Sequence, residues 1–177
     1  MNYFVLSLTV LVTLSVGCKR KSINKQLAAA ARPSVACDTF YFNLADGAMN
    51  GVAPSLPDAD IREWLPCYSS FTPYGSDSNC AGAVFYKKYD FYYYTSKDFV
   101  EARSAYKGRM SPPLLGRSSE EVIALLGSAP VSNKAIDSVN TNLFTTRYGC
   151  LQVDYTNGKA SSVSAHYNEC ETLDTCR

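Results

Sequence analysis

The chain has 177 residues, of which seventeen are basic, sixteen are acidic, seven are cysteines and one, His166, is a histidine. A single histidine cannot supply the usual ligand set of a zinc site, which argues against zinc chemistry. We expect the cysteines other than Cys18 to be oxidised, so His166 has no free thiol to activate, which argues against a Cys–His nucleophile. The net charge of +1 hides a local imbalance: five basic residues and no acidic one lie in 19–36, which leaves −4 for 37–177.

An uncharged, largely apolar segment, residues 4–17, lies near the start of the chain. Its fourteen residues are too few to span a bilayer comfortably, but they suit the hydrophobic region of a signal peptide. The tetrapeptide Ser15-Val16-Gly17-Cys18 resembles a bacterial lipobox, in which Cys18 would receive the lipid, such as palmitate, and become the first mature residue. We therefore expect a signal peptide at 1–17. The alternatives are an ordinary cleaved signal and an uncleaved anchor.

A lipidated basic tether, residues 18–36, is predicted to follow. It shows no apolar periodicity, and its positive charge suits contact with lipid headgroups. It lacks the interleaved aromatic residues of a nucleic-acid-binding segment, so we expect no nucleic acid partner. Lys19, rather than Asp, follows the lipid cysteine, which in the well-studied sorting systems is the outer-membrane pattern.

Six cysteines remain after Cys18, and all six can pair in an oxidising compartment. They are Cys37, Cys67, Cys80, Cys150, Cys170 and Cys176. Fifteen pairings are open. We predict a Cys67–Cys80 disulfide, because it would close a Gly-, Ser- and Pro-rich loop and contribute roughly 3 kcal/mol. A second disulfide, Cys170–Cys176, is predicted for the tail.

The first part of the predicted fold holds a strand, a loop and a helix. Phe40, Phe42 and Leu44 alternate with polar neighbours, which favours a strand. Residues 45–56 are rich in Gly, Asn and Pro and should form a loop. Residues 57–65 are predicted to be a short helix, because acidic residues lie in its first turn, where the helix dipole favours them. Its apolar residues recur at helical spacing: Ile61, Trp64 and Leu65.

The densest aromatic run, residues 83–94 (AVFYKKYDFYYY), is predicted to form strands with a turn at Lys87-Lys88. Successive side chains of a strand point to opposite faces, so these rings cannot all contact the helices. By register with a later strand, we expect Tyr92 and Tyr94 to face the helices.

The outward set is then Tyr89, Phe91 and Tyr93, which we predict to form the partner-binding surface. Tyrosine suits a face that is wet when free and buried when bound, because its ring supplies area and its hydroxyl keeps a polar contact. This assignment places Asp90 on the inner face, and a turn or bulge near Lys88 would reverse it.

Residues 115–130 (LGRSSEEVIALLGSAP) contain a helix with both ends marked. Ser118 and Glu121 form a capping box. Gly127 follows the last apolar position, where a left-handed residue is needed, and Pro130 prevents continuation. So short a helix is not stable alone and must pack on a sheet. Its packing face is predicted to be Val122, Leu125 and Leu126.

Residues 150–163 (CLQVDYTNGKASSV) supply strands of that sheet. Apolar and polar residues alternate from Leu151 to Tyr155, and Asn157-Gly158 is the strongest short hairpin signal. A two-residue loop would pair Val163 with Gln152. A three-residue loop with Gly158 in a bulge would pair Val163 with Leu151 on the apolar face, and we favour the bulge.

These two segments resemble the SmpA/OmlA (BamE-like) family of outer-membrane lipoproteins over about fifty residues. The matching positions are Gly116, Ser118, Glu121, Val122, Leu126, Gly127 and Pro130, followed by Leu151, Val153, Tyr155, Asn157, Gly158 and Lys159. The resemblance implies a structural or assembly role at the outer membrane.

The helical spacing of residues 57–65 recurs 61 positions later, and the same offset lays Tyr94-Thr95 on Tyr155-Thr156. We therefore predict an α+β fold in which two helix-plus-three-strand repeats, 37–106 and 107–177, form one antiparallel sheet with the short helices packed on one face. The layout resembles the β-lactamase-inhibitory protein architecture, and residues 106–115 would be the connector.

No catalytic, cofactor-binding or metal-ligating residue is predicted. The chain has no phosphate-binding glycine motif and no nucleophile-elbow motif, and the calcium-loop pattern is absent. Asp58, Asp60 and Glu63 are explained more simply as acids near a helix end than as a calcium site. We expect no cofactor and no enzymatic activity.

The predicted function is that of a lipid-anchored outer-membrane protein, facing the periplasm, that binds or scaffolds another envelope protein. Outer-membrane assembly machinery is the partner that the family resemblance implies. The alternative is an inhibitor-like or ligand-binding module that captures a secreted enzyme or peptide on its aromatic sheet face.

Overall fold

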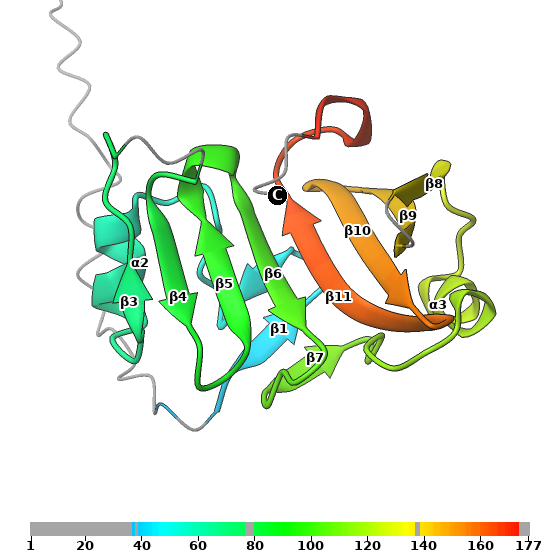
Figure 1. The fold of residues 1–177 in the computed structure, drawn as a ribbon, viewed down its shortest axis with the longest axis horizontal. Coiled ribbons are helices and arrows are strands. Elements are labelled where there is room, and N and C mark those ends of the chain that lie inside the picture. The colour runs from blue at the N-terminus through cyan, green and yellow to red at the C-terminus, as the bar shows by residue number, and fades with distance from the viewer. Residues whose placement is uncertain (1–36, 38, 77–79, 137–138, 174–177) are drawn as a thin grey trace, which may run out of the picture. The chain divides into compact units, whose positions relative to one another are not determined.

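An eight-stranded antiparallel sheet is the largest element of the structure (Figure 1). The structure is a computed structural model that describes residues 37, 39–76, 80–136 and 139–173, all within one unit, Ser34–Arg177. The strands lie side by side in the order β3-β4-β5-β6-β11-β10-β9-β8. Their bounds are Ser70–Phe71 (β3), Ala83–Tyr86 (β4), Phe91–Tyr94 (β5), Phe99–Arg103 (β6), Ser132–Ile136 (β8), Val139–Thr146 (β9), Gly149–Thr156 (β10) and Lys159–His166 (β11).

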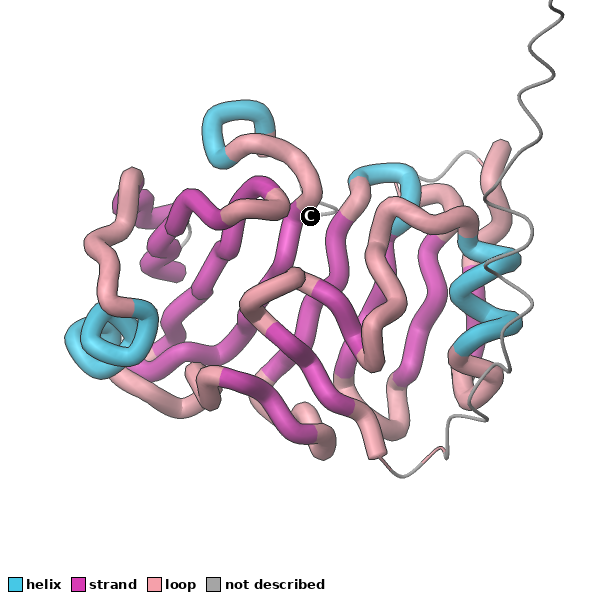
Figure 2. The backbone as a smooth tube through the Cα atoms, turned by 180° about the vertical axis from the view of Figure 1, so that it is seen from behind, coloured by secondary structure: helices cyan, strands magenta, loops and turns pink. Residues whose placement is uncertain are grey.

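A small second sheet covers one face of the large one (Figure 2). It contains β1 (Tyr41–Asn43), β2 (Ala48–Met49) and β7 (Arg109–Ser111), with β1 in the middle. β1 pairs with β2 in antiparallel and with β7 in parallel. Phe42 and Met49 of this sheet are fully buried and belong to the same apolar cluster as the inner face of the large sheet. The main core therefore lies between two sheets.

The first helix, α2 (Asp58–Trp64), begins after Pro57, close to the predicted range. Ile61 and Leu65 are fully buried, and the hydroxyl of Tyr86 in β4 donates a hydrogen bond to the Leu65 carbonyl at 2.7 Å. Trp64, predicted to share this apolar face, is 37% exposed. The helix thus contacts the core through two of its three predicted apolar positions.

The second helix, α3 (Ser119–Leu126), confirms the predicted capping box between Ser118 and Glu121, and Gly127 ends it at φ 67°. Val122 is buried, but Leu125 is 45% exposed, so the predicted apolar face is wrong at that position. The helix lies beside β11 because Gly116 donates to the Ala160 carbonyl and Ala160 donates to the Arg117 carbonyl, both at 2.8 Å.

The predicted α+β fold of two helix-plus-three-strand repeats is wrong, because the structure is mostly β with a separate three-stranded sheet. Residues 106–115, predicted to be a connector, contain β7. The strand predicted around Phe42 does not join the large sheet; it is β1 of the small sheet, where it pairs with β7. The edge strands β3 and β8 were missed: β3 has only two residues, too few to show alternation, and Ser132-Asn133-Lys134 at the start of β8 is polar throughout.

The β10–β11 hairpin turns at Asn157-Gly158 with two residues in the loop, both at positive φ as a type I′ turn requires. A bulge is present, but it lies in β11 at Ser161 rather than at Gly158. The extra residue brings Val163 opposite Val153, so the predicted pairing of Val163 with Leu151 is wrong. The observed partner is the next residue on the same apolar face of β10. The predicted three-residue loop with Gly158 in the bulge is therefore wrong, and the apolar faces are aligned by the bulge at Ser161 instead.

The disulfides differ from the predicted pairs. Cys67 bonds to Cys37, which ties the segment before β1 to the segment after α2. Cys170, in the 3-10 helix η2 (Cys170–Thr172), bonds to Cys150 of β10. Cys80 is also disulfide-bonded, and Cys176, the predicted partner of Cys170, lies outside the described residues. The local loops chosen from spacing were wrong because the fold brings together segments 30 and 20 residues apart in the sequence.

Candidate functional site

The predicted partner-binding residues lie on the inner face of the large sheet. Phe91 and Tyr93 are fully buried and Tyr89 is 8% exposed. The ring of Phe91 stacks on that of Tyr86 with 4.2 Å between centroids, and the Tyr93 hydroxyl donates to the Val52 carbonyl at 2.8 Å. The prediction that these three residues face outward is therefore wrong.

The reversal has two physical causes. Tyr89, Phe91 and Tyr93 do share one side, but across the sheet it is Phe91, not Tyr92, that aligns with Ala102, Val163 and the buried Val153, so the register taken from the later strand was wrong by one residue. The small sheet, which the sequence pattern did not reveal, also places Phe40 against this face, 4.7 Å from the centroid of Phe91. The aromatic residues on this side of β5 are buried because they fill the core between the two sheets.

The opposite face, which we call the open face, carries the other half of the aromatic run. It is the side seen in Figure 1, with β1 and β7 behind the large sheet. Phe85, Tyr92 and Tyr94 lie on it, and their rings make edge-to-face contacts at 6.1 Å and 6.2 Å from Phe85. Tyr92 and Phe85 are half-buried, while Tyr94 stacks on Phe99 at 4.5 Å.

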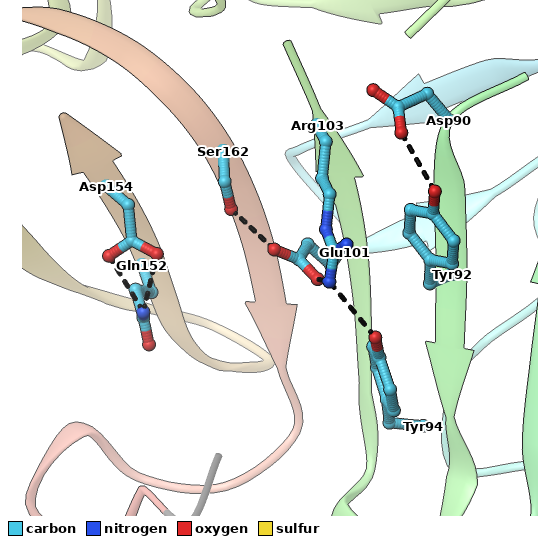
Figure 3. Close-up of polar contacts among 8 residues, drawn as sticks. All are labelled: Asp90, Tyr92, Tyr94, Glu101, Arg103, Gln152, Asp154 and Ser162. Atoms are coloured by element: carbon cyan, nitrogen blue, oxygen red, sulfur yellow. Dashed lines mark hydrogen bonds and ion pairs between the residues drawn. The ribbon is translucent and has the colours of Figure 1, made fainter. Parts of the chain in front are cut away.

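A charged network lies beside these rings (Figure 3). An Arg103 guanidinium nitrogen lies 2.9 Å from a Glu101 carboxylate oxygen and donates to the Tyr94 hydroxyl at 3.3 Å. The same guanidinium lies 4.3 Å from the centre of the Tyr92 ring, within the range of a cation–π contact. The Tyr92 hydroxyl donates to Asp90 at 2.9 Å. The side chains of this network are therefore held in place before any partner arrives.

The phenol groups of the network remain neutral over the physiological range. Burial, together with the negative charge of Glu101, raises the pKa of Tyr94 to about 12. Burial, together with the hydrogen bond to Asp90, raises the pKa of Tyr92 above its ordinary value. These hydroxyls therefore act as hydrogen-bond groups and not as acids or bases.

Farther along the open face, on β9, β10 and β11, the side chains are short and polar. Ser162 donates to Glu101 at 2.9 Å, which links β11 to the charged network. Asp154 accepts hydrogen bonds from Thr141 at 2.6 Å and from Gln152 at 2.9 Å. Asp154 is 5% exposed, so its carboxylate is satisfied within the sheet rather than offered to a ligand.

His166, the last residue of β11, is 1% exposed and stacks on Phe99 with 4.6 Å between ring centroids. Neither ring nitrogen has a hydrogen-bond partner among the residues that the structure describes. Burial lowers the pKa of His166 to about 4, although the nearby charge of Asp154 opposes this shift. The histidine is therefore neutral at physiological pH and packs as an aromatic ring.

Acid should destabilise the protein through this histidine. An unfolded histidine takes up a proton below about pH 6.5, whereas His166 in the folded protein does so only near pH 4. Unfolding therefore binds a proton between these values, and the free energy of unfolding should fall as the pH drops through this window. His166→Phe keeps the stacked ring and removes the titration. Between pH 7.5 and 4.5, urea denaturation should show wild type losing about 2 to 3 kcal/mol more than the variant; equal losses would contradict the burial of a neutral ring.

Comparisons of the chain with protein-family models, curated proteins and solved structures found no match. No group of three His, Cys, Asp or Glu residues in the described part of the chain is placed to hold a metal ion. None of the described helices is both long and apolar enough to cross a membrane. The predicted lipid site, Cys18, lies outside the described residues.

Sequence reasoning missed the charged half of the open face, although a signal for it was present. Glu101 and Arg103 alternate with Val100 and Ala102, both fully buried, as a strand with one wet face requires. That alternation identifies β6 as a strand and places the two charges together on its exposed face. The turn that ends at Asp90 was predicted at Lys87-Lys88, and the structure has it at residues 87–90.

Proposed function

We propose that this chain is an exported bacterial lipoprotein, anchored to the outer membrane through Cys18, that binds another envelope protein on the open face of its large sheet. The observation that carries the proposal is the open face itself. None of the described helices and sheets lies over Tyr92 and Phe85, and the face displays aromatic rings beside a preordered Arg103–Glu101 pair.

Tyrosine and arginine are the residue types enriched at binding hot spots, because they bury large areas with few rotors to freeze. Arg103 is half-exposed while its partner Glu101 is largely buried, so the pair presents a cation whose position is already fixed. Preorganised contacts reduce the entropy lost on binding. The face is therefore suited to a protein surface that offers carbonyl or carboxylate acceptors among apolar side chains.

Export is supported by the disulfides. Cys37–Cys67 and Cys150–Cys170 need an oxidising compartment to persist. The resemblance of residues 115–159 to the SmpA/OmlA family supports an envelope partner, in the first place the outer-membrane assembly machinery. The proposed function is binding without catalysis, because the titratable groups of the open face are held in hydrogen bonds or buried.

Tyr92→Ala and Arg103→Ala should each weaken partner capture about tenfold or more, because both remove contact groups from the centre of the face. The protein, retained on a resin, would be exposed to solubilised envelope, and the captured protein would be identified and quantified by mass spectrometry. Tyr74→Ala is the matched control, because Tyr74 is a 52% exposed tyrosine in the loop before β4, outside the strands of the sheet.

Capture equal to the Tyr74→Ala control would rule out the open face as the binding surface. The identity of the captured protein then separates two roles. A subunit of the barrel-assembly machinery supports an assembly function, and a secreted enzyme held tightly and inhibited supports an inhibitor.

The lipid anchor has its own test. Cys18→Ser should abolish labelling with a palmitate analogue and release the protein from the membrane fraction, because the acyl chains supply the anchoring free energy. If the variant sediments with outer membranes as wild type does, the lipid assignment is wrong.

A further inference from the structure

One end of the large sheet carries a cluster of exposed cations, which we call the basic end. It consists of four residues: Lys87, Lys88, Lys107 and Arg109. The turn between β4 and β5 carries the first two, and the connection from β6 into β7 carries the others. Figure 1 shows this turn and β7 at the lower edge of the ribbon.

Backbone contacts hold these two connections next to each other and to the start of β1. The Lys107 amide donates to the Tyr89 carbonyl at 3.2 Å, and the Arg109 amide donates to the Phe40 carbonyl at 2.8 Å. The rings of Phe40 and Tyr89 are themselves in contact, with 4.7 Å between centroids. The fold therefore brings the four cations together.

The basic end lacks the carboxylate partners that other cations of the fold have. Ion pairs join Arg62 to Asp58, Arg103 to Glu101, and both Arg117 and Lys159 to Glu121. Among the residues that the structure describes, none forms an ion pair with the basic end. The carboxylate of Asp90, in the same turn as Lys88, accepts hydrogen bonds from the Tyr92 hydroxyl and the Ala105 amide.

The charge of this end also differs in sign from that of the fold. Residues 37–41, 86–90 and 104–109 hold four cations and two acids, Asp90 and Asp38, of which Asp38 lies outside the described residues. Their sum is +2, whereas residues 37–177 sum to −4. An anionic surface would therefore attract this end and repel the rest of the fold.

The chain enters the fold at the same end. Cys37 is bonded to Cys67, and two residues later the Ser69 hydroxyl accepts a hydrogen bond from the Lys87 amide at 3.1 Å. Nineteen peptide bonds separate Cys18 from Cys37. A chain of that length reaches roughly 65 Å when extended, so a tether alone would not fix the orientation of the fold.

An exposed aromatic ring lies among the cations. Tyr41, the first residue of β1, is 39% exposed, and the Arg109 guanidinium lies 6.0 Å from the centre of its ring. Both residues line a cleft of about 200 Å³, and none of its described lining residues is acidic. Tyrosine is enriched at the headgroup level of membranes, where its ring is in apolar surroundings and its hydroxyl is in polar ones.

We propose that the basic end docks on the surface of an anionic phospholipid bilayer. The inference rests on the Cys18 anchor of the proposed function, which would keep the basic end near the membrane. Each Lys or Arg beside an anionic surface contributes a factor of about five in binding, so four are enough to orient a protein already held there. Because β4, β5 and β6 end or begin at the basic end, the sheet would stand upright on the membrane. A partner could then approach the open face from the side.

Lysine footprinting of the protein, purified from membranes and reconstituted with vesicles, would test this. The vesicles are phosphatidylcholine with or without cardiolipin, which adds the negative charge. On the anionic vesicles, amine labelling of Lys87, Lys88 and Lys107 should slow about fivefold or more. Labelling of Lys97, at the other end of β5, should not change. At about 1 M salt, where the Debye length falls to about 3 Å, the protection should disappear.

The double variant Lys88→Gln, Lys107→Gln should restore most of the labelling of Lys87 on anionic vesicles, because it removes half of the cations. Both side chains are exposed, so the variant should keep the thermal midpoint of wild type.

Lys97→Gln with Arg147→Gln is the matched control, because it removes the same charge from the opposite end of the sheet. Arg147 lies in the turn before β10, whose Cys150 pairs with His166, and His166 pairs in turn with Phe99, two residues after Lys97. This control should leave Lys87 protected.

Equal labelling of Lys87 on neutral and anionic vesicles would overturn the proposal, and so would equal protection in the two double variants. Protection by soluble polyphosphate in detergent, with none on anionic vesicles, would assign the basic end to a soluble polyanion instead. Attachment to neutral vesicles depends on the Cys18 anchor alone. A missing anchor and a failure of docking therefore give different results.

Discussion

Phe91→Ala should lower the free energy of unfolding by about 3 to 5 kcal/mol, as expected when a large aromatic ring is removed from a packed core. The side chain is fully buried between the two sheets. It stacks on Tyr86 at 4.2 Å and contacts Phe40 at 4.7 Å, so truncation leaves a cavity bordered by rings from both sheets. Neither neighbouring ring can close it without leaving its own contacts.

Tyr92→Ala, one residue along the same strand, is the matched control for this measurement. Tyr92 lies on the open face and is half-buried, so its loss should cost only about 1 kcal/mol. Urea denaturation at neutral pH, followed by tryptophan fluorescence and circular dichroism, would give both values. Equal losses from the two variants would show that the assignment of the two faces is wrong.

Replacing Cys150 and Cys170 together by Ala should cost about 2 to 5 kcal/mol. The disulfide joins positions twenty residues apart, and its loss frees the unfolded chain to adopt more conformations. Both cysteines are buried and pack with Leu143 and Leu173, so the change also removes apolar contacts. The folded tail after β11 would lose its covalent tie to β10.

The matched comparison is the pair Cys37→Ala, Cys67→Ala, in which Cys67 is only half-buried. Its cost should come mainly from chain entropy, because Cys67 packs against the core only as a partly buried side chain. Peptide mapping under non-reducing conditions checks the connectivity first. Detection of a Cys67–Cys80 peptide instead of Cys37–Cys67 would contradict the structure.

Local signals predicted the elements whose stability is local. The capping box at Ser118 and the glycine at 127 specify where α3 begins and ends, whatever the helix packs on. Asn157-Gly158 likewise specifies a tight turn through the backbone angles of two residues. These features were therefore visible in the sequence.

Pairings between distant segments could not be read in this way. β1 and β7 pair in parallel although Phe42 and Met110 are far apart in the chain, and neither segment carries a pattern that names its partner. Because the prediction lacked this sheet, it left the side of β5 that carries Phe91 and Tyr93 without any element packed on it. A period of two shows which rings share a face, but it does not show which face is inside. The outward assignment of Phe91 and Tyr93 failed for this reason.

The junction between β6 and β11 has a consequence for how the protein is made. These strands pair although Arg103 and Ser162 are roughly sixty residues apart, and β11 is the last strand of the sheet to leave the ribosome. Until residues 159–166 have been delivered, β6 has an unpaired edge that can recruit a strand from another chain. Export of an extended chain, as proposed above, would remove that hazard, because folding would begin only after the last strand has crossed. A chain that ends before Lys159 should therefore be an aggregating species rather than a smaller folded one.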